Sequence, residues 1–418
     1  MFRVVGGNRL GGEVRVDGAK NAVLPILAAS LMASGPVVIE DCPRLMDVTN
    51  MLSILKTLGC RVENLENAVR LDAEGAYRWE MPEHLSKSLR SSIFMMGPLL
   101  GRFRRAKVTY PGGCEIGLRP IDLHLKGLKA LGVSVRESHG MILLDGARMR
   151  GGAVYLDFPS VGATENIMMA AAAIRGRTTI HNAAREPEIR DLQNFINAMG
   201  GRIAGAGTDK IVIDGVAGLH GVRYTPIPDR IVAGTLLAAV AAAGGEARIL
   251  RARPEDLGAP LDKLRQTGCE IVEDEHGISI ASSGKIIPFE ISTQPFPGFP
   301  TDLQAQFMAL ACLAEGTSVI VENLFESRFA HAAQLTRMGA DIRVNNRMAV
   351  VRGGKLTGAR VHASDLRGGA ALVIAALAAE GETIVENVAL IDRGYERLER
   401  VLTALGGDVR RIDQESGG

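Results

Sequence analysis

The sequence has few aromatic residues and no excess of charge of either sign. Phe, Trp and Tyr make up 4% of its 418 residues, and 48 Lys and Arg nearly balance 47 Asp and Glu. Proteins that bind nucleic acids need basic patches for the phosphates and, for single strands, aromatic side chains on which bases stack. The composition therefore offers no basis for a nucleic-acid partner.

Paired cysteines and long hydrophobic runs are missing as well. The five cysteines, at positions 42, 60, 114, 269 and 312, are odd in number and include no CxxC pair. This usage predicts a reducing compartment and no metal cluster. The longest apolar runs, near 232–245 and 368–379, are shorter than the roughly 18 residues that span a bilayer, and no secretory segment follows the first residue. We therefore expect a cytoplasmic protein with no membrane partner.

The feature that is present is an internal repeat. A phrase typical of a helix end, a glycine and the start of a strand occurs six times, with its glycine at Gly59, Gly132, Gly200, Gly268, Gly339 and Gly406. The spacings are 73, 68, 68, 71 and 67 residues. A glycine after the last helical turn can adopt the positive φ that ends a helix. Six near-equal spacings predict six copies of one unit.

Each unit contains an Ala-rich, almost wholly apolar helix that runs into a β-branched strand, as in 170–183, 309–324 and 375–388. A helix that is apolar all round is buried, so this α/β protein should have sheets around helices. Two prolines within 221–230 indicate a break that leaves three units on each side. The first strand region, 3–18, could pair with either half.

The first helices of the units begin with cations where cations are unfavourable. The starts lie near 20–21, 89–90, 163–164, 229–230, 301–302 and 366–367, and four of the six carry Lys or Arg in or beside the first turn. The helix dipole disfavours each such cation by a few tenths to about 1 kcal/mol. The pattern indicates that an anion such as phosphate or carboxylate binds there. The alternative is that these side chains simply extend into solvent.

The fifth start carries an acid. Thr301 and Gln304 are spaced as a capping box, with Asp302 in the first turn. Asp302 then has two interpretations: a residue favoured by the helix dipole, or a lone carboxylate among cations that accepts a proton from a substrate hydroxyl. The residues alone favour the first.

One cysteine differs from the other four. Cys114 directly follows two glycines in YPGGCEIGLRPIDLH (110–124), and Arg119 stands five residues later. A nearby cation lowers the pKa of a thiol and raises the thiolate fraction at neutral pH. The segment predicts a reactive thiol on a loop, with an incidental surface cysteine as the alternative. We expect the other cysteines to be packing residues, and the histidines at 124, 181 and 331 show no metal-ligand spacing.

These residues match a known family. The match is carried by VDGAKNAVLPILAAS (16–30), LRSSIFMMGPLL (89–100), YPGGCEIGLRPIDLH (110–124), SVGATENIM (160–168), NAAREPEI (182–189), FPTDLQAQF (299–307), ENLFESRF (322–329), SDLRGGA (364–370) and IDRGYERL (391–398). In register over nearly the whole chain, they resemble the UDP-N-acetylglucosamine 1-carboxyvinyltransferases of the enolpyruvyl transferase family.

The resemblance implies a two-domain inside-out α/β barrel, with three βαβαββ repeats in each domain and buried helices surrounded by sheets. Residues 1–19 and 228–418 would form one domain, and 20–227 the other, which carries the Cys114 loop. The implied reaction moves the enolpyruvyl group of phosphoenolpyruvate to the 3′-hydroxyl of UDP-N-acetylglucosamine by addition and elimination. Phosphate leaves, no cofactor or metal takes part, and the product enters peptidoglycan synthesis.

The family's site residues carry over to matching positions. The implied catalytic residues are Cys114, which protonates the vinyl carbon and can add covalently to phosphoenolpyruvate, Asp302, which holds and deprotonates the sugar hydroxyl, and Lys20 and Arg393. The implied contacts to phosphoenolpyruvate are Lys20, Asn21, Arg119, Arg367 and Arg393. The implied contacts to the sugar nucleotide are Asn21, Arg90, Arg119, Pro120, Ile121, Asp122, Leu123, Ser160, Val161, Gly162, Asp302 and Leu324. Phe158 is a departure, because some members carry lysine there.

Two rival interpretations stay open. The sister enzyme that acts on shikimate 3-phosphate shares the fold and chemistry, although the PGGC and RPIDLH runs resemble nucleotide-sugar recognition. A non-catalytic paralogue that binds the sugar nucleotide is the second rival, against which the intact catalytic set counts. Members with aspartate at position 114 resist the thiol-alkylating antibiotic fosfomycin, so Cys114 implies sensitivity.

Overall fold

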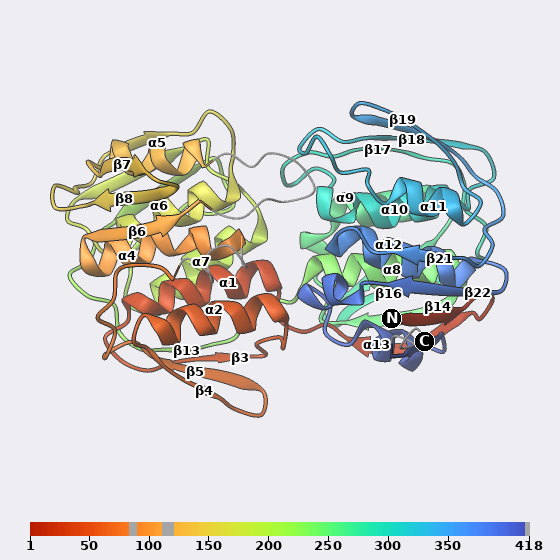
Figure 1. Ribbon diagram of the computed structural model, residues 1–418, viewed down its shortest axis with the longest axis horizontal. Coiled ribbons are helices and arrows are strands. Elements are labelled where there is room, and N and C mark those ends of the chain that lie inside the picture. The colour runs from red at the N-terminus through yellow and green to blue at the C-terminus, as the bar shows by residue number, and fades with distance from the viewer. Residues whose placement is uncertain (83–89, 111–120, 414–418) are drawn as a thin grey trace. The chain divides into compact units, whose positions relative to one another are not determined.

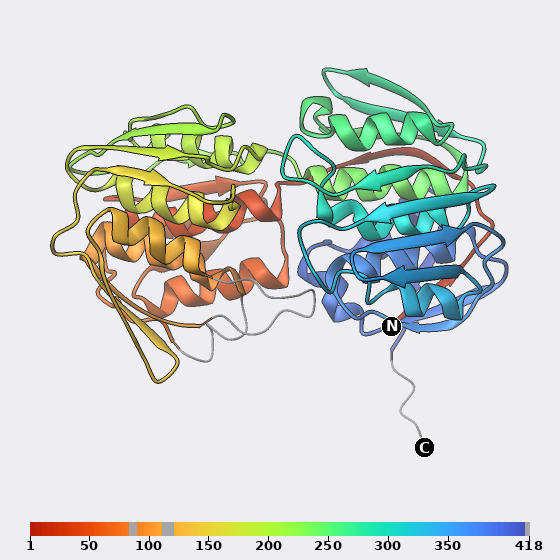
Figure 2. The ribbon, with the colours of Figure 1, turned by 90° about the horizontal axis from the view of Figure 1, so that it is seen from above.

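The computed structural model describes residues 1–82, 90–110 and 121–413, with only the backbone described for Arg90 and Ser91. The chain divides into two units, which Figures 1 and 2 show in two orientations. Unit 1 combines Met1–Asp17 with the chain from Pro228 onward, and unit 2 begins at Gly18 and ends at Ile227.

Three almost wholly buried helices pack on one another in the interior of unit 1 (Figure 1). They are α8 (Arg230–Ala243), α10 (Gln304–Ala311) and α12 (Leu366–Ala378), which bury 12 of 14, 8 of 8 and 11 of 13 residues. The remaining helices are α9 (Gly258–Gln266), α11 (Ala332–Arg337), α13 (Leu398–Ala404) and the 3₁₀ turns η3 (Pro254–Asp256), η4 (Thr301–Leu303) and η5 (Val388–Arg393). The expected burial of the Ala-rich helices is thus confirmed for this unit.

Three four-stranded sheets complete unit 1, in the orders β21-β22-β1-β23, β15-β16-β14-β2 and β17-β18-β20-β19. Their strands are β1 (Phe2–Val5), β2 (Leu10–Arg15), β14 (Gly245–Leu250), β15 (Glu270–Asp274), β16 (Gly277–Ser282), β17 (Glu290–Ser292), β18 (Thr317–Val321), β19 (Asp341–Asn345), β20 (Met348–Arg352), β21 (Arg360–His362), β22 (Glu382–Glu386) and β23 (Asp408–Arg411). The first two strands of the chain therefore pair with strands from the second half of the sequence.

Unit 2 has the same kinds of helix. The inner helices are α1 (Lys20–Ala29), α4 (Met96–Phe103) and α6 (Val161–Ala172), which bury 9 of 10, 6 of 8 and 10 of 12 residues. The outer helices are α2 (Met46–Thr57), α5 (Asp122–Ala130) and α7 (Pro187–Ala198), and the 3₁₀ turns are η1 (Ser30–Met32) and η2 (Arg90–Met95). Because α2, α5 and α7 bury only one face, they are amphipathic.

The sheets of unit 2 have the orders β13-β3-β5-β4, β6-β8-β7 and β11-β12-β10-β9. Their strands are β3 (Val37–Glu40), β4 (Arg61–Asn64), β5 (Ala68–Asp72), β6 (Arg105–Thr109), β7 (Ser134–Ser138), β8 (Met141–Asp145), β9 (Ala153–Tyr155), β10 (Arg177–His181), β11 (Ile203–Ala204), β12 (Lys210–Asp214) and β13 (Arg223–Tyr224).

One order of strand pairing recurs in all five four-stranded sheets: a parallel pair followed by two antiparallel pairs. The β6-β8-β7 sheet has the two antiparallel pairs. On the free side of β6, Glu80 forms an isolated parallel bridge with Lys107. The same pairing order is therefore traceable in each of the six sheets.

The six repeated glycines end six helices in the same way. Each has φ between 88° and 104° and is followed within three residues by a strand. At Gly59, its N–H donates to Lys56 O at 3.0 Å and the Cys60 N–H donates to Leu55 O at 3.0 Å, which is the Schellman motif. The corresponding pair of bonds forms at the other five glycines. The predicted helix, glycine and strand sequence is confirmed at all six positions.

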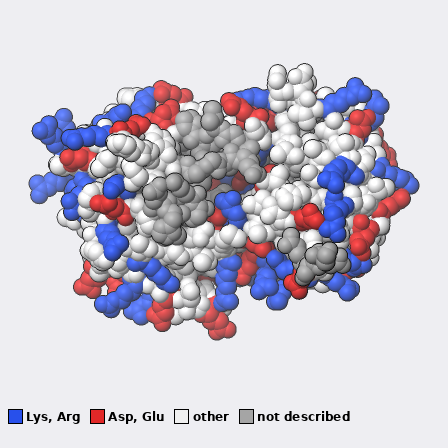
Figure 3. Space-filling model, in the orientation of Figure 1, with Lys and Arg blue, Asp and Glu red and all other residues white. Residues whose placement is uncertain are grey.

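Basic and acidic side chains are interspersed on the face of each unit that Figure 3 draws. This agrees with the near balance of charges in the sequence. Over residues 1–82, 90–110 and 121–413, none of the helices combines the length and the apolarity that crossing a membrane requires.

Candidate active site

The helices α8, α10 and α12 of unit 1 have their starts beside one another. The Arg367 side chain in the first turn of α12 donates to Asp302 in η4, which directly precedes α10. A Cβ added at Gly234 in α8 would lie 2.6 Å from Leu303 Cδ1. Both contacts require the three N-terminal ends to be neighbours. The polar residues at these ends, among them Asp302 and Arg367, form one cluster.

Aspartate caps offset the helix dipole at two of these starts. Asp229 caps α8 and Asp365 caps α12, each accepting hydrogen bonds from two backbone N–H groups at 2.8 to 3.0 Å. The arginines that follow, Arg230 and Arg367, are only 9% and 2% exposed. The alternative that these cations extend into solvent is therefore wrong for this unit.

Asp302 stands in front of two buried guanidinium groups. Its Oδ1 accepts from Arg328 Nη2 at 2.8 Å, and its Oδ2 accepts from Arg367 Nη2 at 3.1 Å and Nε at 3.3 Å. The arginine side chains are 4% and 3% exposed, whereas that of Asp302 is 28% exposed. Charge-assisted bonds fix the carboxylate while one side of it stays open to solvent. An exposed carboxylate of this kind can accept a proton from a bound hydroxyl.

Arg367 keeps its charge although it is buried. Burial alone would lower the pKa of its guanidinium, but the Tyr395 phenol and the Asp302 carboxylate outweigh burial, and the net pKa is raised. Its carbon Cζ lies 5.3 Å from the centre of the Tyr395 ring. Nη1 is buried and has no hydrogen-bond partner within the described part of the chain.

A buried carboxylate, Glu322, ties the next loop to this cluster. Its Oε1 accepts from Thr293 Oγ1 at 2.9 Å and from the N–H groups of Leu324 and Phe325 at 2.9 and 3.1 Å. Its Oε2 accepts from Thr301 Oγ1 at 2.9 Å. The loop that carries Leu324 and Arg328 is thereby bonded to the residue preceding Asp302.

The capping box expected at Thr301 and Gln304 is wrong. Pro300 occupies the N-cap position of η4, and no side chain caps it. The Thr301 hydroxyl donates to Glu322, and the Gln304 amide is buried with neither polar atom bonded to a described residue. The hydrogen bond to the buried carboxylate is charge-assisted and therefore stronger than a bond between neutral groups, so tertiary contact replaces the local motif.

The other predicted residues of unit 1 lie around the same cluster or in its loops. Arg393 is the last residue of η5 and is half-buried. Leu324 is also half-buried and lies three residues after the end of β18, two residues after Glu322. Arg230 lies 5.7 Å, measured from its Cζ, from the centre of the Phe296 ring.

In unit 2, Lys20 begins α1 and pairs with Asp47 in the first turn of α2. Its Nζ lies 3.5 Å from Asp47 Oδ2, and the two side chains are 11% and 4% exposed. Asn21, the next residue, is half-buried. A lysine at a helix start is opposed by the dipole, and the buried Asp47 supplies the compensating charge. No pattern in the sequence indicated this pairing.

The start of α6 collects the predicted Ser160, Val161 and Gly162. Ser160 is the N-cap, and its side chain accepts from the Ala163 N–H at 3.4 Å. All three residues are half-buried. A Cβ at Gly162 would lie 3.0 Å from His124 Cε1, so a side chain would press on that ring. Phe158, just before this turn, is 47% exposed.

His124 has its tautomer set by Asn166. Asn166 Oδ1 accepts from the Gly97 N–H at 2.7 Å, so its Nδ2 is the donor to Ile93 O at 3.0 Å and to His124 Nδ1 at 2.9 Å. With Nδ1 as acceptor, neutral His124 carries its proton on Nε2. This ring, next to the first turn of α6, was not part of the predicted site.

The structure describes only some of the remaining predicted residues. Ile121 is buried, Asp122 is exposed and Leu123 is half-buried, all at or beside the start of α5. Arg90 begins η2, and only its backbone is described. Cys114, Arg119 and Pro120 lie outside the described residues.

The cysteines in the described segments have unreactive surroundings or are only partly buried. Burial raises the pKa of the Cys60 and Cys312 thiols to about 12 and also raises that of Cys269. Cys42 is half-buried. A raised pKa lowers the thiolate fraction at neutral pH, in agreement with the packing roles expected for Cys60, Cys269 and Cys312.

Two buried titratable groups lie close to the predicted residues. Burial, together with Glu188 and Glu186, raises the pKa of Glu165 in α6 well above its ordinary value. Burial lowers the pKa of His331, three residues after Arg328, to about 4. Burial therefore favours the neutral form of both groups, and neither Glu165 oxygen nor either His331 nitrogen has a hydrogen-bond partner in the described chain.

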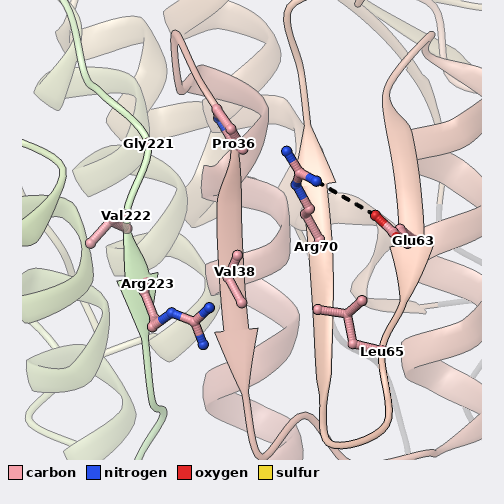
Figure 4. Close-up of a pocket in the computed structure, with 8 residues that line it drawn as sticks. All are labelled: Pro36, Val38, Glu63, Leu65, Arg70, Gly221, Val222 and Arg223. Atoms are coloured by element: carbon pink, nitrogen blue, oxygen red, sulfur yellow. Dashed lines mark ion pairs between the residues drawn. The ribbon is translucent and has the colours of Figure 1, made fainter.

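A cavity of about 530 Å³ lies elsewhere in unit 2, on the β13-β3-β5-β4 sheet (Figure 4). Its lining residues are Pro36, Val38, Glu63, Leu65, Arg70, Gly221, Val222 and Arg223. Arg70 is paired with Glu63 at 3.7 Å. Because the lining contains none of the predicted site residues, we assign it no chemistry.

Sequence reasoning missed Arg328, Glu322, Tyr395 and Asp47, which hold the predicted residues in place. Arg328 and Glu322 both fall within ENLFESRF, and Tyr395 falls within IDRGYERL. These segments were recognised, but single-sequence patterns show which residues are polar and not which polar residues meet.

Comparison with known proteins extends these observations. The family model described as EPSP synthase (3-phosphoshikimate 1-carboxyvinyltransferase) matches residues 4–402. The chain is 53% identical over 413 residues to the protein of Caldanaerobacter subterraneus named UDP-N-acetylglucosamine 1-carboxyvinyltransferase 2, covering 98% of this chain and 99% of the relative. It is 48% identical over 412 residues to the Myxococcus xanthus protein named UDP-N-acetylglucosamine 1-carboxyvinyltransferase, covering 98% of each.

Solved structures share the fold. The enolpyruvyl transferase NikO from Streptomyces tendae superposes with a TM-score of 0.88 at 27% identity, covering 98% of each chain. An EPSP synthase from Acinetobacter baumannii has a TM-score of 0.74 at 17% identity, covering 98% of this chain and 99% of its own, which shows likeness of fold alone. The α/β fold of this chain is therefore one that these solved proteins also have.

Proposed function

The chain belongs to the enolpyruvyl transferase family, and we propose that it transfers the enolpyruvyl group of phosphoenolpyruvate to the 3′-hydroxyl of UDP-N-acetylglucosamine. Phosphate is the second product. The observation that carries this proposal is the likeness, at about half identity over 98% of the chain, to curated proteins named for this reaction. We further propose that the enzyme works in the cytoplasm, at the first committed step of peptidoglycan synthesis.

The proposed chemistry is addition followed by elimination. In the addition, the sugar oxygen bonds to C2 of phosphoenolpyruvate, its proton goes to a base, and the vinyl carbon gains a proton from an acid. In the elimination, the tetrahedral ketal loses a proton from its methyl group as the C–O bond to phosphate breaks. The reaction needs one base, one acid and cations that stabilise phosphate and carboxylate.

We assign Asp302 as the group that holds and deprotonates the sugar hydroxyl. Its partly exposed carboxylate, held by two buried guanidiniums, supports this role. Arg367 and Arg393 are assigned to the anionic donor, because guanidinium groups suit its phosphate and carboxylate. Leu324 is assigned to the sugar-nucleotide pocket.

The remaining roles are assigned to unit 2. Lys20, Asn21 and Arg119 are assigned to phosphoenolpyruvate, and Cys114 to proton donation to the vinyl carbon. The sugar nucleotide is assigned to Asn21, Arg90, the run 119–123 and the first turn of α6, with its half-buried Ser160, Val161 and Gly162. Backbone N–H groups at a helix start suit the diphosphate of such a ligand.

We infer that the architecture is an inside-out barrel in each of two domains, 1–19 with 228–418 and 20–227. Six copies of a βαβαββ unit, three in each domain, would place buried helices within sheets. The shared pairing order of the sheets and the six glycine-ended helices support this inference.

A phosphate-release assay tests the proposed function. The purified chain is supplied with phosphoenolpyruvate and either UDP-N-acetylglucosamine or shikimate 3-phosphate, and inorganic phosphate is measured. We expect release only with the sugar nucleotide. Release with shikimate 3-phosphate would identify the sister activity instead. Binding of the sugar nucleotide without release would identify a non-catalytic paralogue.

A second prediction concerns the thiols. We expect fosfomycin to add one equivalent at Cys114, because a thiolate opens the epoxide and the pKa values of Cys60, Cys269 and Cys312 are raised by burial. Intact-mass and peptide measurements locate the adduct. Cys114→Ala should remain unlabelled, and Cys42→Ala, which removes the half-buried alternative, should still take up one equivalent. An adduct on any other cysteine would contradict the assignment.

A further inference from the structure

Tyr395 packs against Arg367, one of the residues that the proposed reaction uses. It is 2% exposed and follows η5, two residues after Arg393. The centre of its ring lies 5.3 Å from Cζ of Arg367. Its hydroxyl lies 2.9 Å from Thr235 Oγ1 in α8 and 3.1 Å from Gln306 Nε2 in α10. One side chain thus contacts all three buried helices of unit 1.

The directions of these hydrogen bonds follow from counting protons. Thr235 Oγ1 donates its one proton to Ile231 O at 2.7 Å, so it must accept from Tyr395. Gln306 Nε2 has two protons for three acceptors within reach, the phenol of Tyr395, Thr235 Oγ1 at 3.0 Å and the backbone oxygen of Asp302 at 2.9 Å, so at least one proton is shared between two of them. The phenol is therefore both donor and acceptor in a network that ends on the backbone of Asp302.

The network connects Asp302 and Arg367, which form an ion pair. Through Gln306 it reaches Asp302, and through its ring Tyr395 supports Arg367, which donates to Asp302 at 3.1 and 3.3 Å. The bonds of this buried network restrict the arrangement of its members, although Gln306 Oε1 has no hydrogen-bond partner among the described residues. Loss of the hydroxyl would remove one of the two donors to Thr235 Oγ1 and leave Gln306 Nε2 bonded to Thr235 and to the backbone oxygen of Asp302.

From this geometry we propose that Tyr395 is a positioning residue for enolpyruvyl transfer, which holds Arg367 and the Asp302 carboxylate in the arrangement that turnover needs. The inference rests on the proposed function. Tyr395 touches no reacting atom in this scheme and acts only through Arg367, Gln306 and Thr235.

Tyr395→Phe tests the proposal because it removes the hydroxyl and keeps the ring over Arg367. We expect kcat to fall by about 10- to 100-fold, since small misplacements of catalytic groups have effects of this size. The KM for the sugar nucleotide should stay within about twofold, because no ligand contact is removed.

The matched control is Tyr224→Phe in unit 2, which also removes a bonded phenol, here one that donates to Asp191 Oδ1 at 2.6 Å. A purely structural role predicts that the two variants lose thermal stability alike and that both retain kcat. If Tyr395→Phe, measured well below its melting temperature, keeps kcat within about twofold of the wild type, the proposal is wrong.

A crystal structure of Tyr395→Phe separates this proposal from the proposed function. We expect the contacts between Arg367 and Asp302 to lengthen or rearrange by about 0.5 Å or more, the tolerance within which catalytic groups are held. Unchanged contacts would overturn the positioning role whatever the enzyme's activity. Absence of turnover in the wild type would overturn the proposed function and leave the structural outcome to decide the role of Tyr395.

Discussion

Asp302→Asn should lower kcat by about 100- to 10,000-fold, the range that a positioned general base contributes. Asparagine keeps the shape of the side chain and one acceptor oxygen for a guanidinium, but it takes up no proton at neutral pH. The Kd for the sugar nucleotide should change by less than about tenfold, because the hydroxyl can still bond to the amide. Turnover is therefore lost far more than binding.

Steady-state phosphate release and calorimetric titration of the sugar nucleotide measure the two quantities. The control is Asp274→Asn, which removes another aspartate from an arginine pair in unit 1, with Arg248 at 2.7 Å, on the protein surface. That variant should keep both kcat and Kd. If Asp302→Asn lost binding and turnover by equal factors, Asp302 would be a binding residue and the base would have to be sought elsewhere.

Local structure was predictable where one residue decides it. Each of the six repeated glycines ends a helix with positive φ, and the bonds that stop the helix come from the glycine and its neighbour. Such a motif depends on about six consecutive residues. The burial of the Ala-rich helices was predictable for a similar reason, because a helix apolar on every side has no face for water.

Contacts between distant segments were not predictable in this way. Thr301 and Gln304 have the spacing of a capping box, but the Thr301 hydroxyl bonds to Glu322, 21 residues away. Likewise, the cations at the helix starts were visible in the sequence, while their acidic partners were not: Lys20 meets Asp47 across 27 residues, and Arg367 meets Asp302 across 65.

The repeat itself shows where sequence reasoning stops. Glu322 and Glu386 occupy the same place in two copies, each within the triplet Val-Glu-Asn at a strand end. Glu386 lies at the surface with its side chain 31% exposed and pairs with Arg360 at 2.6 Å. Glu322 is fully buried and accepts four hydrogen bonds. Equal sequence positions thus have different roles, set by the neighbouring segments.

This contrast between Glu322 and Glu386 leads to a prediction of a large loss of stability. Glu322→Ala should lower the free energy of unfolding by about 4 kcal/mol, because it leaves two hydroxyls and two backbone N–H groups of a buried site without their acceptor. Glu322→Gln should cost about half as much, roughly 2 kcal/mol, since the amide oxygen can still serve part of the donors. Urea unfolding followed by circular dichroism measures both.

Glu386→Ala is the control that the repeat provides, because it removes the equivalent carboxylate from an exposed ion pair. Exposed pairs contribute at most about 1 kcal/mol, so this variant should unfold close to the wild type. Equal losses for Glu322→Ala and Glu386→Ala would mean that the four hydrogen bonds contribute no net stability. The expected difference in the free energy of unfolding would instead show that one buried carboxylate stabilises the loop bearing Arg328. Because Arg328 bonds to Asp302, the same carboxylate would then help to place Asp302.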